Sequence, residues 1–207
     1  MVNTSWLLSS ARAAGAGALA SGRWLAETVI DIAPRIPIRD LETLRQHHNG
    51  LAGAALADEV IRAATRSSAA VGAAAGALAG AEELAPPAWL ALPLDLLVET
   101  VAVAAIEMKL VAELHEVYER PVPGPAGDRA MAIVQAWAER RGVTGSRRGA
   151  RGELVRLVRR RLLRRLGRNL STLAPLLIGA VAGAEVNRRA TRSLGQAIAD
   201  DLGSRTR

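Results

Sequence analysis

The apolar residues of this chain fall mainly in three long runs, separated by stretches rich in proline, glycine or charge. The clearest run covers residues 88–119, with the sequence AWLALPLDLLVETVAVAAIEMKLVAELHEVYE, and the others cover residues 51–84 and 169–203. Alanine and leucine dominate the runs and are among the strongest helix formers, whereas the aromatic residues that favour strands are nearly absent. The pattern predicts an all-α protein, built as a bundle of helices.

Shorter elements are predicted between and before these runs. We expect a helix over residues 4–30 and a short helix over residues 40–48, with Asp40 as the N-cap of the second. The stretch RPVPGPAGD at residues 120–128 is predicted to be a loop, because proline and glycine interrupt regular structure. Asp128 is then expected to cap the helix that follows.

The length of 207 residues is enough to bury a hydrophobic core. We expect an N-terminal helical extension over residues 1–49 and a helical domain over residues 50–207. Because the chain has no Phe, one Tyr and four Trp, its core depends on small side chains and on helix backbones that lie close together. With no cysteine, the chain cannot form a disulfide, a thiolate metal site or a thiol nucleophile.

Glycines recur every four residues in two of the predicted helices. A glycine inside a helix costs up to about 1 kcal/mol relative to alanine, so such a repeat indicates direct backbone contact with another helix. This spacing occurs in membrane helix dimers and in tight crossings in water, and we favour a crossing in which the two glycine faces pack on each other. The glycines concerned are Gly72, Gly76, Gly80, Gly179 and Gly183.

The succession of small residues resembles the EcsC family, which is named for the third gene product of a bacterial ABC-transporter operon. The resemblance covers residues 50–202 and rests on GAAAGALAG, LPLDLLVETVAVAAIEMKLVAELHEVYE and LIGAVAGAEVNRRATRSLGQA. Family members usually continue the tyrosine of the second block with glycine, whereas Tyr118 is followed here by Glu119. The resemblance implies a helical protein of unestablished activity that is often discussed alongside membrane transport.

Four ionisable residues of the longest run are candidate catalytic residues. Asp95 and Glu99 lie one helical turn apart, which also makes them a candidate metal-binding pair. Glu107 and Lys109 follow the wholly apolar segment 101–106. Buried carboxylates have to be paired, protonated or bound to a cation, so these positions need partners.

We favour a structural ion-pair network for these acids over a functional site. Lys109 is expected to supply one positive partner, and Arg188 or Arg189 another. Asn187 and Arg188 are expected to face the Asp95–Glu99 pair across the bundle.

The end of the longest helix carries Glu113, His115 and Glu116, which we expect to lie in solvent. The chain has no H-E-x-x-H motif, phosphate-binding glycine loop, G-x-S-x-G or dinucleotide fingerprint. No motif therefore assigns a catalytic residue, and the sequence leaves open whether the protein is an enzyme.

The net charge of +7 is unevenly spread, with 8 basic and 14 acidic residues in 1–119 against 19 and 6 in 120–207. Residues 153–168 form a predicted amphipathic helix with seven arginines. Such a surface attracts phosphate, and we expect an anionic membrane surface rather than sequence-specific nucleic acid, because base-stacking aromatics are absent. The arginines expected to face phosphate or lipid are Arg156, Arg159, Arg160, Arg164, Arg188 and Arg189.

The first functional hypothesis is a non-enzymatic accessory protein that contacts anionic lipid and, as the family resemblance implies, is linked to transport. We expect it to be cytoplasmic and peripheral at the inner face of the membrane, because residues 1–24 lack the basic start of a secretory signal. No segment is a clean transmembrane span, since the apolar runs are too short or carry acidic residues. This hypothesis requires no cofactor.

The second hypothesis is a helical enzyme that acts on a hydrophobic, phosphate-bearing substrate such as an isoprenoid diphosphate. Asp95 and Glu99 would hold Mg²⁺, and Arg188 or Arg189 would bind phosphate. Apart from this hypothesis, Lys109 could be a desolvated amine able to form a Schiff base, although a single lysine among carboxylates more often forms an ion pair, which we favour. We rank the enzyme second because the paired acidic motifs of Mg²⁺-dependent diphosphate ionisation are missing.

Overall fold

A computed structural model describes residues 23–82, 92–140 and 176–204, with side chains over 27–77, 98–140 and 180–204. Within these ranges the chain forms six α-helices and one 3-10 turn, and no strand, which confirms the all-α prediction. The elements are α2 (Arg23–Ile32), η1 (Ala33–Arg35), α3 (Leu41–His47), α4 (Gly53–Glu82), α5 (Leu92–Val117), α6 (Ala126–Arg140) and α8 (Leu176–Ser204).

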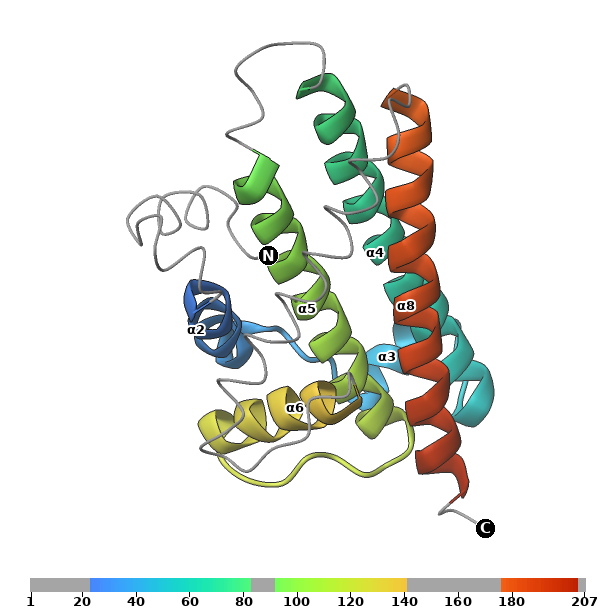
Figure 1. The fold of residues 1–207 in the computed structure, drawn as a ribbon. Coiled ribbons are helices and arrows are strands. Elements are labelled where there is room, and N and C mark those ends of the chain that lie inside the picture. Colours follow the sequence, from blue (N-terminus) through green and yellow to red (C-terminus); the bar gives the residue numbers. More distant parts are fainter. Residues whose placement is uncertain (1–22, 83–91, 141–175, 205–207) are drawn as a thin grey trace.

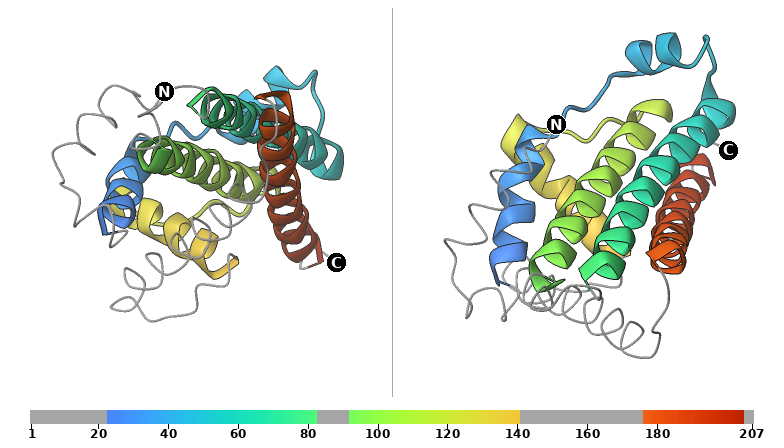
Figure 2. Two further views of the ribbon diagram at one scale, coloured as in Figure 1. Left: turned by 45° about the horizontal axis from the view of Figure 1, so that its top comes forward. Right: turned by 90° about the horizontal axis from the view of Figure 1, so that it is seen from above.

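Three long helices form the centre of the molecule (Figure 1). Helices α5 and α8 run in the same direction, and α4 runs antiparallel to both. The most extensive contact is between α4 and α8, and α5 packs against both. Helix α6 lies across the lower end of α5, and α2 lies beside α5 (Figure 2). None of the described helices combines the length and apolarity needed to cross a membrane.

Local signals set the ends of α3 as the sequence predicts. Asp40 has extended backbone angles, and its carboxylate accepts a hydrogen bond of 2.8 Å from the Thr43 N–H. Asn49 and Gly50 follow with φ values of +56° and +75°, the left-handed region in which a helix ends.

Helix α6 begins earlier than predicted. Its first residue is Ala126, so Asp128 lies in the first turn, and the expectation that Asp128 caps the helix is wrong. The carbonyl of Pro125 accepts the first helical hydrogen bond from the Arg129 N–H, at 3.0 Å. Pro125 is therefore the N-cap residue, and the helix begins directly after it.

A single hydrophobic cluster connects the described elements. Val29 of α2 and Leu44 of α3 are buried in the same cluster as Met108 and Leu114 of α5. Trp137 of α6 is the largest fully buried side chain and closes the lower end of the cluster. The described residues before position 50 therefore share a core with the helices that follow them.

The backbones of α4 and α8 touch where two glycines meet. A Cβ added to Gly72 or Gly183 would overlap the carbonyl oxygen of the other residue. Further along the same crossing, a Cβ on Gly195 would lie 2.8 Å from Cγ1 of Ile61. These contacts explain why the sequence tolerates glycine inside two long helices.

Gly183→Ala is expected to lower the free energy of unfolding by about 2 kcal/mol, because the added methyl group forces the two helices apart. Gly127→Ala in α6 is the matched control, since nothing lies within 4 Å of a Cβ there. The control should leave stability unchanged or raise it by up to about 1 kcal/mol. Urea unfolding followed by far-ultraviolet circular dichroism compares the two, and equal stabilities would contradict a steric role for the glycine contact.

Candidate functional site

The candidate acids of α5 lie along the whole helix and do not converge on one point. Among the described side chains, Glu99, Glu107 and Glu113 are buried, with 4%, 0% and 2% of their surface exposed. Asp95 is in the first part of α5, whose side chains lie outside the described residues. Because an isolated buried carboxylate is costly, the partners of each glutamate decide its role.

Glu99 meets Asn187 of α8. The Asn187 side-chain amide donates a hydrogen bond of 2.8 Å to Oε1 of Glu99, so the predicted contact between these two residues is confirmed. The expectation that Arg188 or Arg189 also faces the buried acids is wrong, because both arginines lie on the outer surface and pair with Glu185. Each step along a helix turns the side chain by about 100°, which carries these positions away from α5.

Glu107 is the centre of a buried chain of hydrogen bonds. The Trp137 indole N–H donates to Oε2 of Glu107 at 2.8 Å, and the Thr191 hydroxyl donates to Oε1 at 3.0 Å. The Thr191 and Ser68 hydroxyl oxygens are 2.8 Å apart. Because Thr191 has a single hydroxyl hydrogen, it donates to Glu107 or to Ser68 at any one time, and the Ser68 hydroxyl donates in turn to the Asn187 carbonyl at 3.4 Å. The chain of hydrogen bonds thus joins α4, α8, α5 and α6.

Glu113 lies under the segment that leads into α3. The Arg39 guanidinium binds it through Nε at 2.7 Å and Nη2 at 2.8 Å, and the Lys109 ammonium lies 2.7 Å from Oε1. Lys109 also donates to the Pro37 carbonyl. The predicted ion pair of Lys109 is therefore present, whereas the prediction that Glu113 is solvated is wrong. The cause is tertiary, because residues 36–39 cover this turn of α5.

The partners of Glu113 also control its pKa. Burial raises the pKa of this carboxyl, but the hydrogen bonds and positive charges of Arg39 and Lys109 outweigh burial and hold the pKa below its ordinary value. His115 and Glu116, the other two residues that we expected to lie in solvent, are partly buried. Nδ1 of the His115 ring lies 3.0 Å from the Arg120 carbonyl oxygen. Through Arg39, Glu113 thus holds the 36–39 segment against α5.

The sequence analysis did not predict the roles of Ser68, Thr191, Trp137 and Arg39, although one signal in the sequence points to Ser68 and Thr191. Ser68 lies one turn before Gly72 on the same row of α4, and Asn187 and Thr191 continue the row of Gly183 along α8. The small residues that permit the crossing and the hydroxyls that bond across it therefore follow one spacing of four residues. Trp137 and Arg39 have no comparable signal.

The register of α4 against α8 also determines the outer surface of the pair. Gly72 lies opposite Gly183, and Ile61 lies opposite Gly195, so the two helices are antiparallel. The residue after each interface position is rotated by about 100° around its helix axis. In an antiparallel pair this rotation brings the following residues of both helices to the same side of the pair. This side faces away from the buried hydrogen bonds that Asn187 makes to α5.

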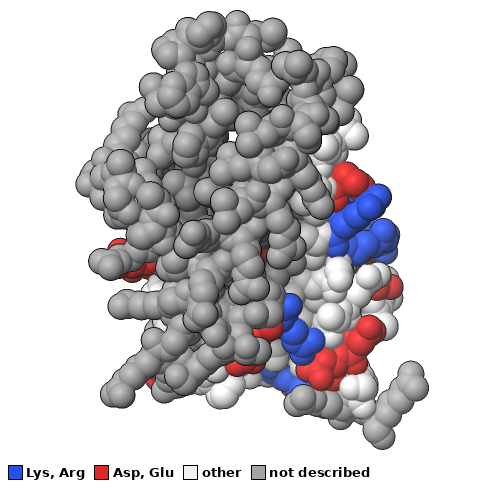
Figure 3. Space-filling view, in the orientation of Figure 1, with Lys and Arg blue, Asp and Glu red and all other residues white. Residues whose placement is uncertain are grey.

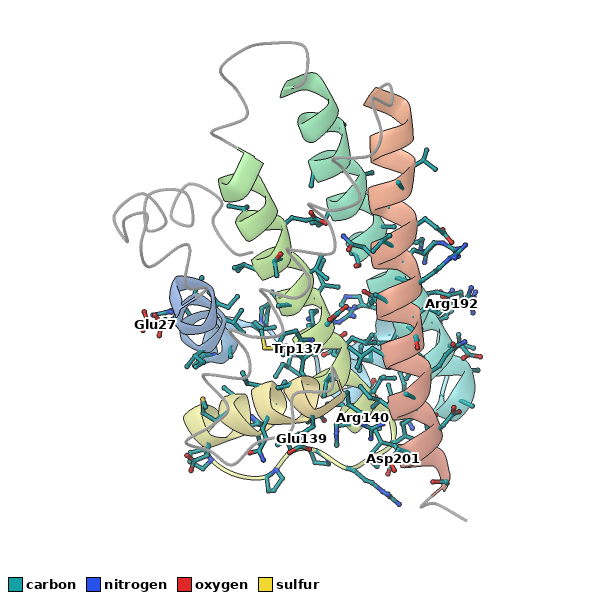
Figure 4. The ribbon with its side chains drawn as sticks, in the orientation of Figure 1. Glu27, Trp137, Glu139, Arg140, Arg192 and Asp201 are labelled. Carbon is teal, nitrogen blue, oxygen red and sulfur yellow. The ribbon has the colours of Figure 1, made fainter. Side chains whose placement is uncertain are left out.

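Exposed arginines occupy this outer side, and we call them the arginine face. Figure 3 shows blue side chains gathered at the right edge of the molecule, with red side chains beside them. In Figure 4 the side chain of Arg192 points outward from α8, whereas Trp137 lies between α6 and α5. The arginine face consists of Arg62, Arg66, Arg188, Arg189 and Arg192, all of which are exposed.

Two glutamates neutralise part of the arginine face. Glu59 pairs with Arg62 at 2.8 Å, and Glu185 pairs with Arg188 and Arg189. Hydrogen bonds from these two arginines lower the pKa of Glu185 to about 2, so its carboxylate stays ionised. Five arginines and two glutamates leave an excess of three positive charges on the described side chains of this face.

The remaining arginines of the face, Arg66 and Arg192, form no ion pair with any residue that the structure describes. The other arginines expected to face lipid, Arg156, Arg159, Arg160 and Arg164, lie outside the described residues. Within the described ranges, no group of three or more histidine or acidic side chains could hold a metal ion.

None of the family models, curated proteins or solved structures compared with this chain matches it. The resemblance to the EcsC family therefore rests on the three quoted stretches of sequence alone.

Thr191→Val is expected to lower the free energy of unfolding by about 2 kcal/mol, because it removes the hydroxyl that joins buried Glu107 to Ser68. Thr65→Val is the matched control on α4, since the buried Thr65 hydroxyl has no hydrogen-bond partner among the described residues. Loss of the Thr65 hydroxyl should leave the free energy of unfolding unchanged or raise it. Chemical unfolding measures both, and an equal loss in the two variants would contradict the role assigned to Thr191.

Glu113→Gln is expected to lower the free energy of unfolding by about 3 kcal/mol at neutral pH, since it leaves Arg39 and Lys109 without their carboxylate. Because the pKa of Glu113 is lower in the folded state, its ionised carboxylate stabilises the fold fully above the unfolded pKa of about 4.3. This stabilisation is lost as pH falls through the folded pKa. The difference from the wild type should therefore shrink below about pH 4. Unfolding at several pH values tests this, with Glu116→Gln as the control that should change little at any pH.

Proposed function

We propose that the protein is a non-enzymatic, peripheral membrane-associated helical protein whose arginine face binds anionic lipid headgroups. The observation that carries the proposal is the position of Arg66 and Arg192. Both are exposed on the same outer side of the α4–α8 pair, and neither is neutralised by a described acid. Guanidinium groups that no described acid neutralises can bind phosphate oxygens.

The size of the expected effect follows from the charge of the face. Each basic residue near an anionic membrane surface contributes about 1 kcal/mol, so an excess of three charges contributes about 3 kcal/mol. That corresponds to an increase in affinity of about 150-fold over an uncharged surface of the same shape. Binding of this kind is reversible and weakens as salt rises, because ions screen exposed charges.

The chemistry of the buried acids is in keeping with a structural role. Each described buried glutamate of α5 accepts hydrogen bonds from the protein, and these bonds connect α5 to α6, α8 and the segment before α3. Nucleic acid is a poorer fit to the arginine face than lipid, because the face carries no aromatic residue on which bases stack. No described observation favours the Mg²⁺-dependent alternative.

The double variant Arg66→Gln/Arg192→Gln is expected to bind anionic vesicles about 30-fold more weakly than the wild type, because it lowers the excess charge of the face from three to one. The control Arg35→Gln/Arg129→Gln removes the same charge from η1 and α6, away from the arginine face, and should bind like the wild type. Co-sedimentation with vesicles of phosphatidylcholine and phosphatidylserine measures both. The proposal fails if the wild type does not bind, or if the two doubles lose affinity equally.

A further inference from the structure

A pocket of about 140 Å³ lies near the place where α6 crosses the lower end of α5 (Figure 1). Its walls come from residues 38–40 before α3, from α5, from the loop after α5 and from the first half of α6, all of which the structure describes. We infer that this pocket binds a free α-amino acid with a small aliphatic side chain, such as leucine or valine. No residue of the arginine face lines the pocket, so the inference is independent of the proposed function.

The base of the pocket is apolar. Ala112 of α5 and Ile133 of α6 are buried, with 3% and 4% of their surface exposed. Ile38 and Val122 are partly buried and pack against the same hydrophobic core. An aliphatic side chain that lies on these residues is removed from water, which favours binding. The base therefore suits the apolar part of the ligand.

The other lining residues are charged, and their charges balance. Two are basic and two are acidic: Arg39, Arg129, Asp40 and Glu116. An anion such as phosphate would meet two carboxylates here, and a cation would meet two guanidinium groups. An α-amino acid offers each pair the opposite charge, because it carries an ammonium and a carboxylate on one carbon atom. The lining therefore favours a ligand that carries both charges.

Glu116 and Arg129 are the two groups available for direct ion pairs with the ligand. Glu116 is partly buried and Arg129 is exposed, and neither side chain forms an ion pair or a hydrogen bond with any residue that the structure describes. They line one pocket without pairing with each other, so a zwitterion can lie between them. Its ammonium then binds Glu116 and its carboxylate binds Arg129 through charge-assisted hydrogen bonds.

Arg39 and Asp40 are held in place by other contacts and provide a second contact for each end of the ligand. Arg39 uses Nε and Nη2 to bind Glu113, which leaves Nη1 for a carboxylate. Asp40 accepts the Thr43 N–H through Oδ1, which leaves Oδ2 for an ammonium. Hydrogen bonding from Thr43 also holds the pKa of Asp40 below its ordinary value, so the carboxylate stays ionised at neutral pH.

The volume of the pocket limits the ligand to a small molecule. An engineered cavity of about 150 Å³ in another protein core binds benzene, so an aliphatic side chain of about four carbon atoms fits here. Pockets for drug-sized ligands begin at about 300 Å³, and nucleotides and larger coenzymes are therefore too large for this one.

Binding of leucine analogues to the wild-type chain tests the need for both charges. L-Leucine is expected to bind with a Kd of about 0.1 mM, measured by isothermal titration calorimetry. The analogue 4-methylpentanoate lacks the ammonium, and 3-methylbutylamine lacks the carboxylate. Each analogue should bind about tenfold more weakly, because it loses one charge-assisted contact. An analogue that binds as tightly as leucine overturns the inference.

Glutamine substitutions test the two unpaired groups. Glu116→Gln and Arg129→Gln are each expected to weaken leucine binding about tenfold, and neither should unfold the protein because neither residue has a described partner. Glu139→Gln and Arg35→Gln are the matched controls, since neither residue lines the pocket, and they should bind leucine like the wild type. Equal losses in the pocket variants and the controls overturn the inference.

A combination of variant and analogue separates direct contact from a structural effect. Because Glu116 binds the ammonium, Glu116→Gln should not weaken the binding of 4-methylpentanoate, which has none. A further loss with this analogue would show that the substitution distorts the pocket and would overturn the role of Glu116. Failure of both leucine and valine to bind the wild type at about 10 mM overturns the inference as a whole, and binding to anionic vesicles then still stands or falls by its own test.

Discussion

The backbone contact between Gly72 and Gly183 sets the distance between α4 and α8, and the other contacts of the centre depend on that distance. Any side chain at either position would hold the two helices apart. Serine and threonine are short, so their hydroxyls meet across a helix interface only when the backbones are close. The 2.8 Å approach of Ser68 and Thr191 is therefore a consequence of the glycine contact, and so is the hydrogen bond that Thr191 extends to Glu107.

Buried acids are tolerated here because each is matched to donors from another part of the chain. Glu107 receives hydrogen bonds from α6 and α8, and Glu113 receives an arginine from the segment before α3. Alanine, valine and leucine are similar in shape, so a core built from them does not by itself fix how the helices are placed against one another. Helices with small side chains can slide past one another at little cost in free energy. The acids supply the missing specificity, since any sliding of α6 or of the 36–39 segment would leave a buried carboxylate without its donors.

The sequence predicts what local rules determine. Asp40 caps α3 because a short carboxylate suits an N-cap, and the glycine repeat predicts a backbone crossing because helices tolerate repeated glycine poorly without one. Partners distant in sequence follow no such rule: Arg39 reaches Glu113 across 74 positions. Helix α5 is also apolar on almost every side, so its pattern does not show which acids are covered. Arg188 was predicted to face α5, but it lies one residue, or about 100°, beyond Asn187, and therefore faces solvent.

That single step also connects the interior of α8 to its surface. Asn187 and Thr191 point toward the buried acids, and the next residues, Arg188 and Arg192, belong to the arginine face. Rotation of α8 would break the hydrogen bonds inside and move the arginines outside at the same time, so the buried network holds the face in one arrangement. A basic face on a fixed helix loses less conformational entropy on binding than the same arginines would lose in a flexible tail. In the proposed function, the interior polar network therefore contributes to binding at the surface without touching the bound partner.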